Sequence, residues 1–138
     1  MRKLDNESIA ALLRKHGISP TSQRIKIAAL LLSCMEHLSA DQIMFSVNKR
    51  KAEASKATIY NTLKLFVKKG LVREVIIDPS RILYDPNTSR HHHFYDIVTG
   101  ELRDIDESEL SILNLPPLPQ DRIFEGLDII IRTRPATV

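Results

Sequence analysis

The chain has 138 residues, 43% hydrophobic and 27% charged, a composition that suits one compact globular domain or two very small ones. No apolar run approaches the roughly 20 residues of a membrane-spanning helix, and the charged N-terminus lacks a signal-peptide core. We therefore expect a cytoplasmic protein with no membrane partner. Cys34 is the only cysteine, which excludes an intramolecular disulfide and a structural zinc site of four cysteines.

Charge is divided unevenly along the chain. Residues 1–84 hold 15 Lys and Arg against 7 Asp and Glu, a net charge of +8, whereas residues 85–138 hold 5 against 10, a net charge of −5. A basic half followed by an acidic half indicates two modules with different partners, and the partner of the first is a polyanion.

Four helices are predicted before Gly70. The first spans Asp5–Lys15, and the second begins at Pro20-Thr21. The third has Ser39 as N-cap in a capping-box spacing with Gln42. The fourth spans Ser55–Lys69. The predicted apolar positions of the second and third helices are Ile25, Ala28, Ala29 and Leu32, then Ile43 and Val47.

The fourth helix has two chemically different faces. Ile59, Leu63, Phe66 and Val67 form an apolar side. The opposite side offers cations, a phenol and an amide, from Lys56, Tyr60, Asn61, Lys64 and Lys68. Such a face is either simply solvated or binds a polyanion.

The segment after this helix decides between the two interpretations. Residues 71–77 are predicted to form a strand, 78–80 a turn and 81–84 a return strand. Helices closed by a hairpin, with a basic last helix, are the plan of a winged helix-turn-helix domain. We expect the fourth helix in the major groove of DNA and the hairpin on the phosphate backbone.

The remaining residues predict a hinge at 85–89 and a small α/β module at 90–138, so the fold class is α+β with a DNA-binding domain at 1–84. Expected elements are strands at Phe94–Val98 and Glu101–Ile105, a short helix at Asp106–Leu113, and a final strand at Leu127–Thr133. The Ile129–Ile131 run predicts burial of that strand on both faces. A module this small is expected to complete its core in a homodimer.

Three consecutive histidines suggest a metal site. In a strand His91 and His93 would share a face, although a solvated loop is an equally simple interpretation. With His37, Asp85 and Asp104 they would provide three imidazoles and two carboxylates without sulfur, a set that favours Fe²⁺, Mn²⁺ or Zn²⁺.

The sequence resembles the ferric uptake regulator (Fur) superfamily of dimeric, metal-sensing transcription factors over nearly its whole length. The matching stretches are Gly17–Arg24, His37–Asp41, Ser55–Leu63 as the recognition helix, Tyr84-Asp85, His91–His93, and Gly100 with Asp104. The resemblance implies a regulatory metal site at the same five residues, His37, Asp85, His91, His93 and Asp104. It also implies a repressor that binds a double-stranded DNA operator, with Thr58 among the residues that contact it.

Two departures from the family pattern are visible. Many relatives have CxxC pairs for a structural zinc, but here Thr99 replaces such a cysteine and none follows Cys34. A basic residue that often precedes the family's threonine for minor-groove contact is replaced by Ser19-Pro20.

Two branches of the family fit. Asp104 resembles the peroxide-sensing PerR type, in which iron-dependent oxidation would fall on His37 or His91, while Cys34, in an apolar helix sequence, is expected to be buried and a poor sensor. The missing cysteines and the HHH run also resemble the iron-responsive Irr type, which would admit haem. Other classes considered are a metalloenzyme, disfavoured because no nucleophile or general base is evident, and a winged-helix protein-interaction module. We expect a regulator and not an enzyme.

Overall fold

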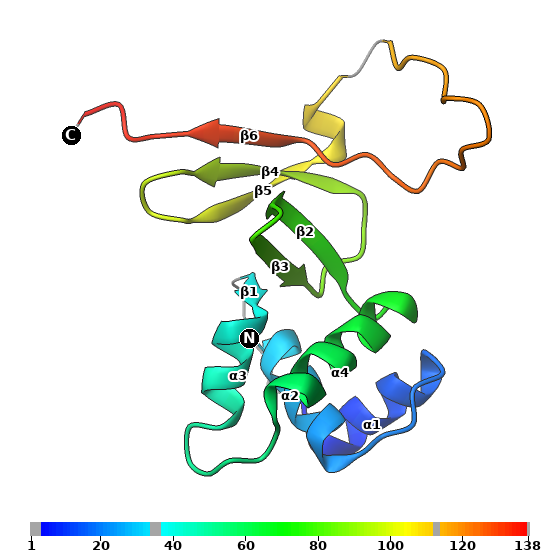
Figure 1. The fold of residues 1–138 in the computed structure, drawn as a ribbon, viewed down its shortest axis with the longest axis vertical. Coiled ribbons are helices and arrows are strands. Elements are labelled where there is room, and N and C mark those ends of the chain that lie inside the picture. The colour runs from blue at the N-terminus through cyan, green and yellow to red at the C-terminus, as the bar shows by residue number, and fades with distance from the viewer. Residues whose placement is uncertain (1–3, 34–36, 112–113, 138) are drawn as a thin grey trace. The chain divides into compact units, whose positions relative to one another are not determined.

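The computed structural model describes residues 4–33, 37–111 and 114–137. The chain divides into two compact units, residues 1–88 and 89–138 (Figure 1). No helix in the described ranges is long and apolar enough to span a bilayer. The expected burial of Cys34 concerns a residue that lies outside these ranges.

Four helices form the base of the first unit, as predicted. They are α1 (Asn6–Lys15), α2 (Ser22–Ser33), α3 (Ala40–Val47) and α4 (Lys56–Lys68). Asp5 caps α1 by accepting a hydrogen bond from the Ser8 amide, and Ser39 caps α3 in a reciprocal capping box with Gln42. The Ser39 box confirms the predicted start of the third helix.

The core of the first unit is built from the apolar faces of these helices. Ile9, Leu13, Ile43, Ile59 and Phe66 are all 1% exposed or less. The predicted face of α2 is wrong in its details. Its most buried residues are Ile27, Ala28 and Leu31, while Ile25, Ala29 and Leu32 are only partly buried. Because every position from 27 to 32 is apolar, periodicity cannot define one face.

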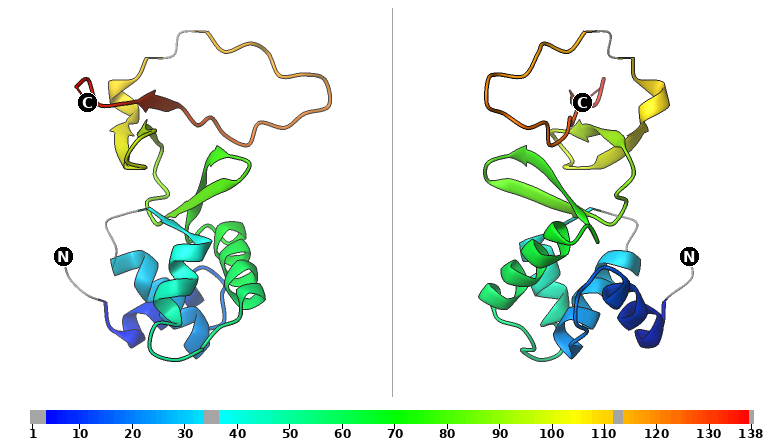
Figure 2. Two further views of the ribbon diagram at one scale, coloured as in Figure 1. Left: turned by 60° about the vertical axis from the view of Figure 1, so that its left-hand side comes forward. Right: turned by 90° about the vertical axis from the view of Figure 1, so that its right-hand side faces the viewer.

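A three-stranded sheet closes the first unit, in the order β1-β3-β2 (Figure 2). The predicted hairpin is present as β2 (Arg73–Asp78) and β3 (Arg81–Asp85), and the Asp78 carboxylate accepts the Ser80 amide in its turn. No pattern in the sequence indicates β1 (Leu38–Ser39), which pairs antiparallel with β3. Helices closed by this hairpin confirm the winged helix-turn-helix plan.

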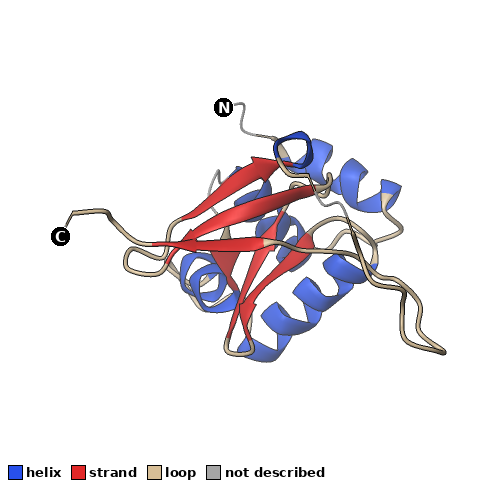
Figure 3. Cartoon of the chain, turned by 90° about the horizontal axis from the view of Figure 1, so that it is seen from above, coloured by secondary structure: helices blue, strands red, loops and turns tan. Residues whose placement is uncertain are grey.

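The second unit holds a separate sheet of β4 (His91–Asp96), β5 (Leu102–Asp106) and β6 (Ile130–Thr133), in the order β5-β4-β6 (Figure 1). The strands of both units are drawn in red in Figure 3. β4 includes the three histidines and ends before Val98, two residues earlier than predicted. The Asp96 carboxylate accepts the amides of Val98 and Thr99, which turns the chain toward β5.

Further predictions for the second unit are wrong, among them the start of the final strand, which lies at Ile130 and not at Leu127. The helix expected at 106–113 is a single 3₁₀ turn, Glu107–Glu109, capped by Asp106 and followed by extended backbone at Leu110; Leu113 lies outside the described residues. Ile129–Ile131 are only half-buried, because β6 occupies one edge of the sheet and pairs with β4 alone. A continuous isoleucine run therefore marks an edge here and not a central strand.

Candidate functional site

The first group of candidate ligands is His37 and Asp85, and the β1–β3 register brings them together. Leu38 pairs with Tyr84 in an antiparallel ladder, so His37, one residue before, lies opposite Asp85, one residue after. The His37 Nε2 and Asp85 Oδ2 atoms are 2.8 Å apart, and both side chains are almost buried. The other Asp85 oxygen accepts the Asn87 amide at 2.9 Å, which fixes the orientation of the carboxylate.

The second group lies on β4 and β5. His93 pairs directly with Asp104 across the antiparallel ladder, and His91 shares its face two residues earlier. The Asp104 Oδ1 atom is 3.3 Å from His93 Nε2 and 3.7 Å from His91 Nε2. The two imidazole rings lie 4.6 Å apart, edge to face. Both histidines are buried, while the Asp104 side chain is 45% exposed.

The hydrogen bonding of His91 fixes its tautomer. Its Nδ1 atom lies 2.7 Å from the Ser89 carbonyl oxygen, which can only accept, so Nδ1 carries the proton. In the neutral ring the lone pair is then on Nε2, the atom that lies 3.7 Å from Asp104 Oδ1. A histidine that binds a metal usually donates the N–H of its other ring nitrogen to an oxygen such as a backbone carbonyl.

The middle histidine is used differently. His92 projects to the other side of β4, where its Nδ1 accepts the backbone amide of Ile129 at 3.1 Å. The adjacent His93 amide donates to the Ile129 carbonyl at 3.0 Å. The HHH run thus supplies two candidate ligands and one residue that holds the segment leading into β6.

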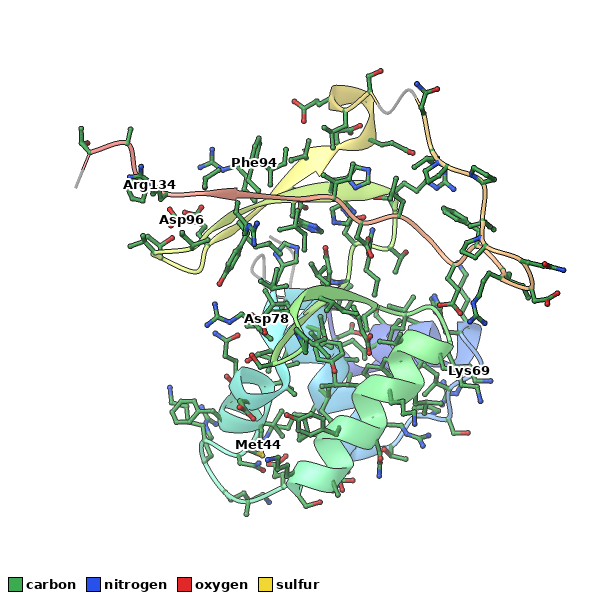
Figure 4. The ribbon with its side chains drawn as sticks, turned by 45° about the horizontal axis from the view of Figure 1, so that its top comes forward. Met44, Lys69, Asp78, Phe94, Asp96 and Arg134 are labelled. Carbon is green, nitrogen blue, oxygen red and sulfur yellow. The ribbon has the colours of Figure 1, made fainter. Side chains whose placement is uncertain are left out.

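The exposed polar face predicted for α4 is present. Lys56, Tyr60, Asn61, Lys64 and Lys68 are all exposed, and they fall on one arc of the helix opposite the buried Ile59, Leu63 and Phe66. The Lys56 ammonium lies 5.9 Å from the centre of the Tyr60 ring. Figure 4 shows Lys69 labelled at the end of this helix and Met44 on α3.

Thr58 has a structural role that the sequence did not reveal. It is half-buried and lies off the exposed arc of α4. Its amide donates to Ser55 Oγ at 3.1 Å, and its hydroxyl accepts from Ser55 Oγ at 3.0 Å. These bonds complete the N-terminal cap of α4.

A groove of about 360 Å³ lies beside Tyr60 and adds residues that the sequence did not single out. Its walls include Ser39 and Asp41 of α3 and Ser80 and Arg81 of the hairpin. Burial, with the nearby Glu74 carboxylate, raises the pKa of the Tyr84 phenol in the same wall, so this group stays neutral and polar. Only the packing of the hairpin against α3 and α4 brings these residues to one place.

The chain is similar to known proteins in sequence and in fold. The model of the ferric uptake regulator family matches residues 15–115. A peroxide-responsive repressor PerR of Staphylococcus epidermidis is 36% identical over 104 residues, 75% of this chain and 69% of the relative. One from Staphylococcus aureus is 36% identical over 105 residues, 76% of this chain and 70% of the relative.

Solved structures share the fold at low sequence identity. The ferric uptake regulator of Pseudomonas aeruginosa with manganese has a TM-score of 0.68 at 20% identity, covering 92% of this chain and 97% of that one. The Helicobacter pylori ferric uptake regulator has a TM-score of 0.65 at 17% identity, covering 96% and 94%. By its family match and its curated relatives, this chain belongs to the ferric uptake regulator family.

Proposed function

We propose that the protein is a metal-dependent transcriptional repressor that binds operator DNA as a homodimer and senses peroxide through bound iron. The observation that carries this proposal is the presence of two preformed groups of metal donors, His37 with Asp85 and His91 with His93 and Asp104, in a chain that also presents a basic helix face. The staphylococcal relatives are peroxide-responsive repressors, which supports the choice of signal.

The proposed metal site consists of all five donors. Alone, the pair in the first unit offers two ligands and the group in the second unit offers three, whereas together they offer five to a single ion. One ion that takes ligands from both would fix the orientation of the two units and close the hinge at 85–89. The nitrogen and oxygen donors fit Fe²⁺ or Mn²⁺, and Zn²⁺ in vitro.

DNA recognition is assigned to the exposed arc of α4. We propose that Tyr60 and Asn61 read base edges while Lys56, Lys64 and Lys68 contact phosphates. Thr58 serves this face indirectly, because its bonds to Ser55 hold the first turn of the helix. Residues 1–84 then form the DNA-binding domain.

Residues 90–138 are proposed to hold the homodimer. Several large apolar side chains in the described part of this unit are exposed, and such residues are candidates for a protein–protein interface. The exposed large apolar residues described in this unit are Phe94, Ile97, Val98, Leu115, Leu118, Ile123, Phe124 and Leu127. A second copy would cover them without the structural zinc that cysteine-containing relatives use.

The proposed sensing step concerns the ligand imidazoles. Bound Fe²⁺ would supply the reducing chemistry that activates peroxide at the site. The net reaction transfers one oxygen atom from peroxide to an imidazole carbon and releases one water. His37 and His91 are the proposed targets, and their modification would weaken both metal and DNA binding.

The test compares iron and manganese forms of the full-length protein. Chelation should lower DNA affinity, and either metal should restore it. Peroxide should then inactivate the Fe²⁺ form, spare the Mn²⁺ form, and add one oxygen atom to a peptide containing His37 or His91. Equal loss of DNA binding with manganese, or no effect of chelation, would falsify the mechanism.

A second candidate is an Irr-like regulator that responds to iron or haem, favoured by the single cysteine and the HHH run. The bond from the Ile129 amide to His92 weighs against haem ligation by that residue unless the bond opens. Absorbance titration of the protein with haem, with DNA affinity measured in parallel, separates this candidate from the peroxide sensor.

A further inference from the structure

The loop between α3 and α4 carries a cluster of positive charge that the proposed function has not used. Lys49, Arg50 and Lys51 are consecutive and all exposed. They lie beyond the end of α3 at Val47 and four residues before the Ser55 cap of α4. We refer to residues 49–51 as the basic loop.

The basic loop is closed by a single side chain. Asn48, at the end of α3, accepts the amides of Glu53 and Ala54 on its Oδ1 at 2.8 and 2.9 Å. Its Nδ2 donates to the Ala54 carbonyl at 2.8 Å. Three bonds from one residue join both ends of the loop, so its cations are held on a short, fixed turn and not on a mobile linker.

The acidic residue nearest the loop is already paired elsewhere. The Glu53 carboxylate lies 2.6 Å from Lys26 of α2, and the Glu53 carbonyl accepts from Gln23 at 2.7 Å. The hydrogen bond from Lys26, with a smaller contribution from the charge of Lys51, holds the pKa of Glu53 below its usual value. These contacts attach the loop to α2 and leave Lys49 and Arg50 facing solvent.

The loop also lies at the positive end of the recognition helix. It leads into the N-terminus of α4, whose first turn contains no acidic residue and begins with Lys56 (Figure 1). The positive potentials of the backbone amides and of the side-chain cations therefore add at this end of the helix. The field favours a ligand with several regularly spaced negative charges over one that carries a single charge.

We propose that the basic loop is a second phosphate-binding element that contacts the DNA backbone beside the segment read by α4. This inference rests on the proposed DNA-binding function and extends it to residues off the helix face. Contacts of this kind fix the register of the protein on the duplex and raise affinity for every sequence equally. The loop sets affinity and salt dependence, while Tyr60 and Asn61 set sequence preference.

The experiment measures binding of the Mn²⁺-loaded, full-length protein to a random-sequence duplex of about 30 base pairs at about 50 and 200 mM salt. Each phosphate that the variant no longer neutralises should reduce the ratio of the two affinities by about 3.5-fold. The test variant is Lys49→Gln/Arg50→Gln/Lys51→Gln. A variant with the same charge change at three exposed residues of the second unit, Arg103→Gln/Arg132→Gln/Arg134→Gln, is the control. Sedimentation first establishes that it assembles as the unmodified protein does, because this unit is proposed to hold the homodimer.

A third variant, Lys64→Gln/Lys68→Gln, separates failure of this inference from failure of the proposed function. If it lowers the salt dependence while the loop variant behaves as the unmodified protein, the loop does not bind DNA but the helix does. If neither variant lowers it, both proposals fail. Reduced salt dependence in the loop variant, with the second-unit control unchanged, supports the loop.

Asn48→Ala tests the rigidity of the loop without changing its charge. We expect weaker binding and a smaller salt dependence, because cations on an open loop lose more entropy when they bind phosphates. Far-UV circular dichroism establishes that α3 and α4 remain folded. A folded Asn48→Ala protein with the affinity and salt dependence of the unmodified protein overturns the claim that the loop is preorganised.

Discussion

Replacing Asp104 by Asn should damage metal binding far more than its partial exposure suggests. One oxygen of this carboxylate lies 3.3 Å from His93 Nε2 and 3.7 Å from His91 Nε2. A cation bound by both imidazoles would therefore lie beside this oxygen. The amide keeps the shape of the side chain but removes its negative charge, which neutralises part of the charge of a divalent ion.

The size of the loss in metal affinity can be bounded from substitutions that do not remove a ligand. Changing a residue that merely orients a metal ligand typically lowers affinity about 10–100-fold. Removing a charged ligand should cost at least the upper end of that range, about 2.8 kcal/mol or more. Mn²⁺ affinity is the suitable measurement, by anaerobic competition with a fluorescent chelator, because manganese avoids oxidation during the titration.

Asp106→Asn is the matched control. Asp106 is on the same strand and pairs with His91, so it lies on the same face of β5 as Asp104. Its carboxylate, however, accepts the Ser108 amide and hydroxyl at 2.9 Å. The control variant should retain nearly normal Mn²⁺ affinity. If both variants lose affinity equally, or neither does, Asp104 is not the ligand.

Three further predictions address recognition, assembly and folding. Tyr60→Ala should lose preference for duplexes selected from a random pool by the unmodified protein, as measured by competition with unselected duplexes; full retention of that preference would contradict base reading by Tyr60. Truncation after Asp104 should give a monomer with poor DNA affinity, and sedimentation of the truncated protein as a dimer would place the interface elsewhere. Hydrogen bonds from the Thr99 and Val98 amides hold the pKa of Asp96 below its usual 3.8, so their stabilising effect is present above that pH and is lost as the pH falls through the lowered value. The urea concentration at half unfolding should therefore fall less between about pH 5 and pH 3 for Asp96→Asn than for the unmodified protein, and an equal fall in both would refute this role.

Elements defined by local chemistry could be predicted from the sequence. The Ser39 capping box, the hairpin turn at Asp78 and the two faces of α4 depend on residues only a few positions apart. The apolar face of α2 could not be predicted in this way, because its sequence is apolar on several sides. Hydrophobicity places Val98 in a strand, but the Asp96 side chain competes for its amide and turns the chain.

Among the candidate ligands too, some could be placed from local sequence and others could not. Alternation along a strand is enough to place His91 and His93 together, but no local pattern distinguishes Asp104 from Asp106. The resemblance to a family selects Asp104, and hydrogen bonding gives the physical reason, since the Asp106 carboxylate is occupied by its own turn. His37 could not be placed from local sequence at all, because it meets Asp85 only through the two-residue strand β1.

The way the donors are divided matters for regulation. A metal ion can change DNA affinity only if it binds one arrangement of the protein more tightly than another. A site built within one unit would bind equally well in every arrangement of the two units, so its occupancy would carry no information to the DNA. Under the proposed function, donors divided between the units would make metal binding depend on the relative placement of the units, and that placement would set the separation of the two α4 helices in the proposed homodimer. The coupling is then reciprocal, so operator DNA must tighten metal binding by the same factor by which metal tightens DNA binding. In the proposed mechanism, oxidation of one ligand histidine would remove this coupling without altering the exposed face of α4, so the repressor would leave its operator.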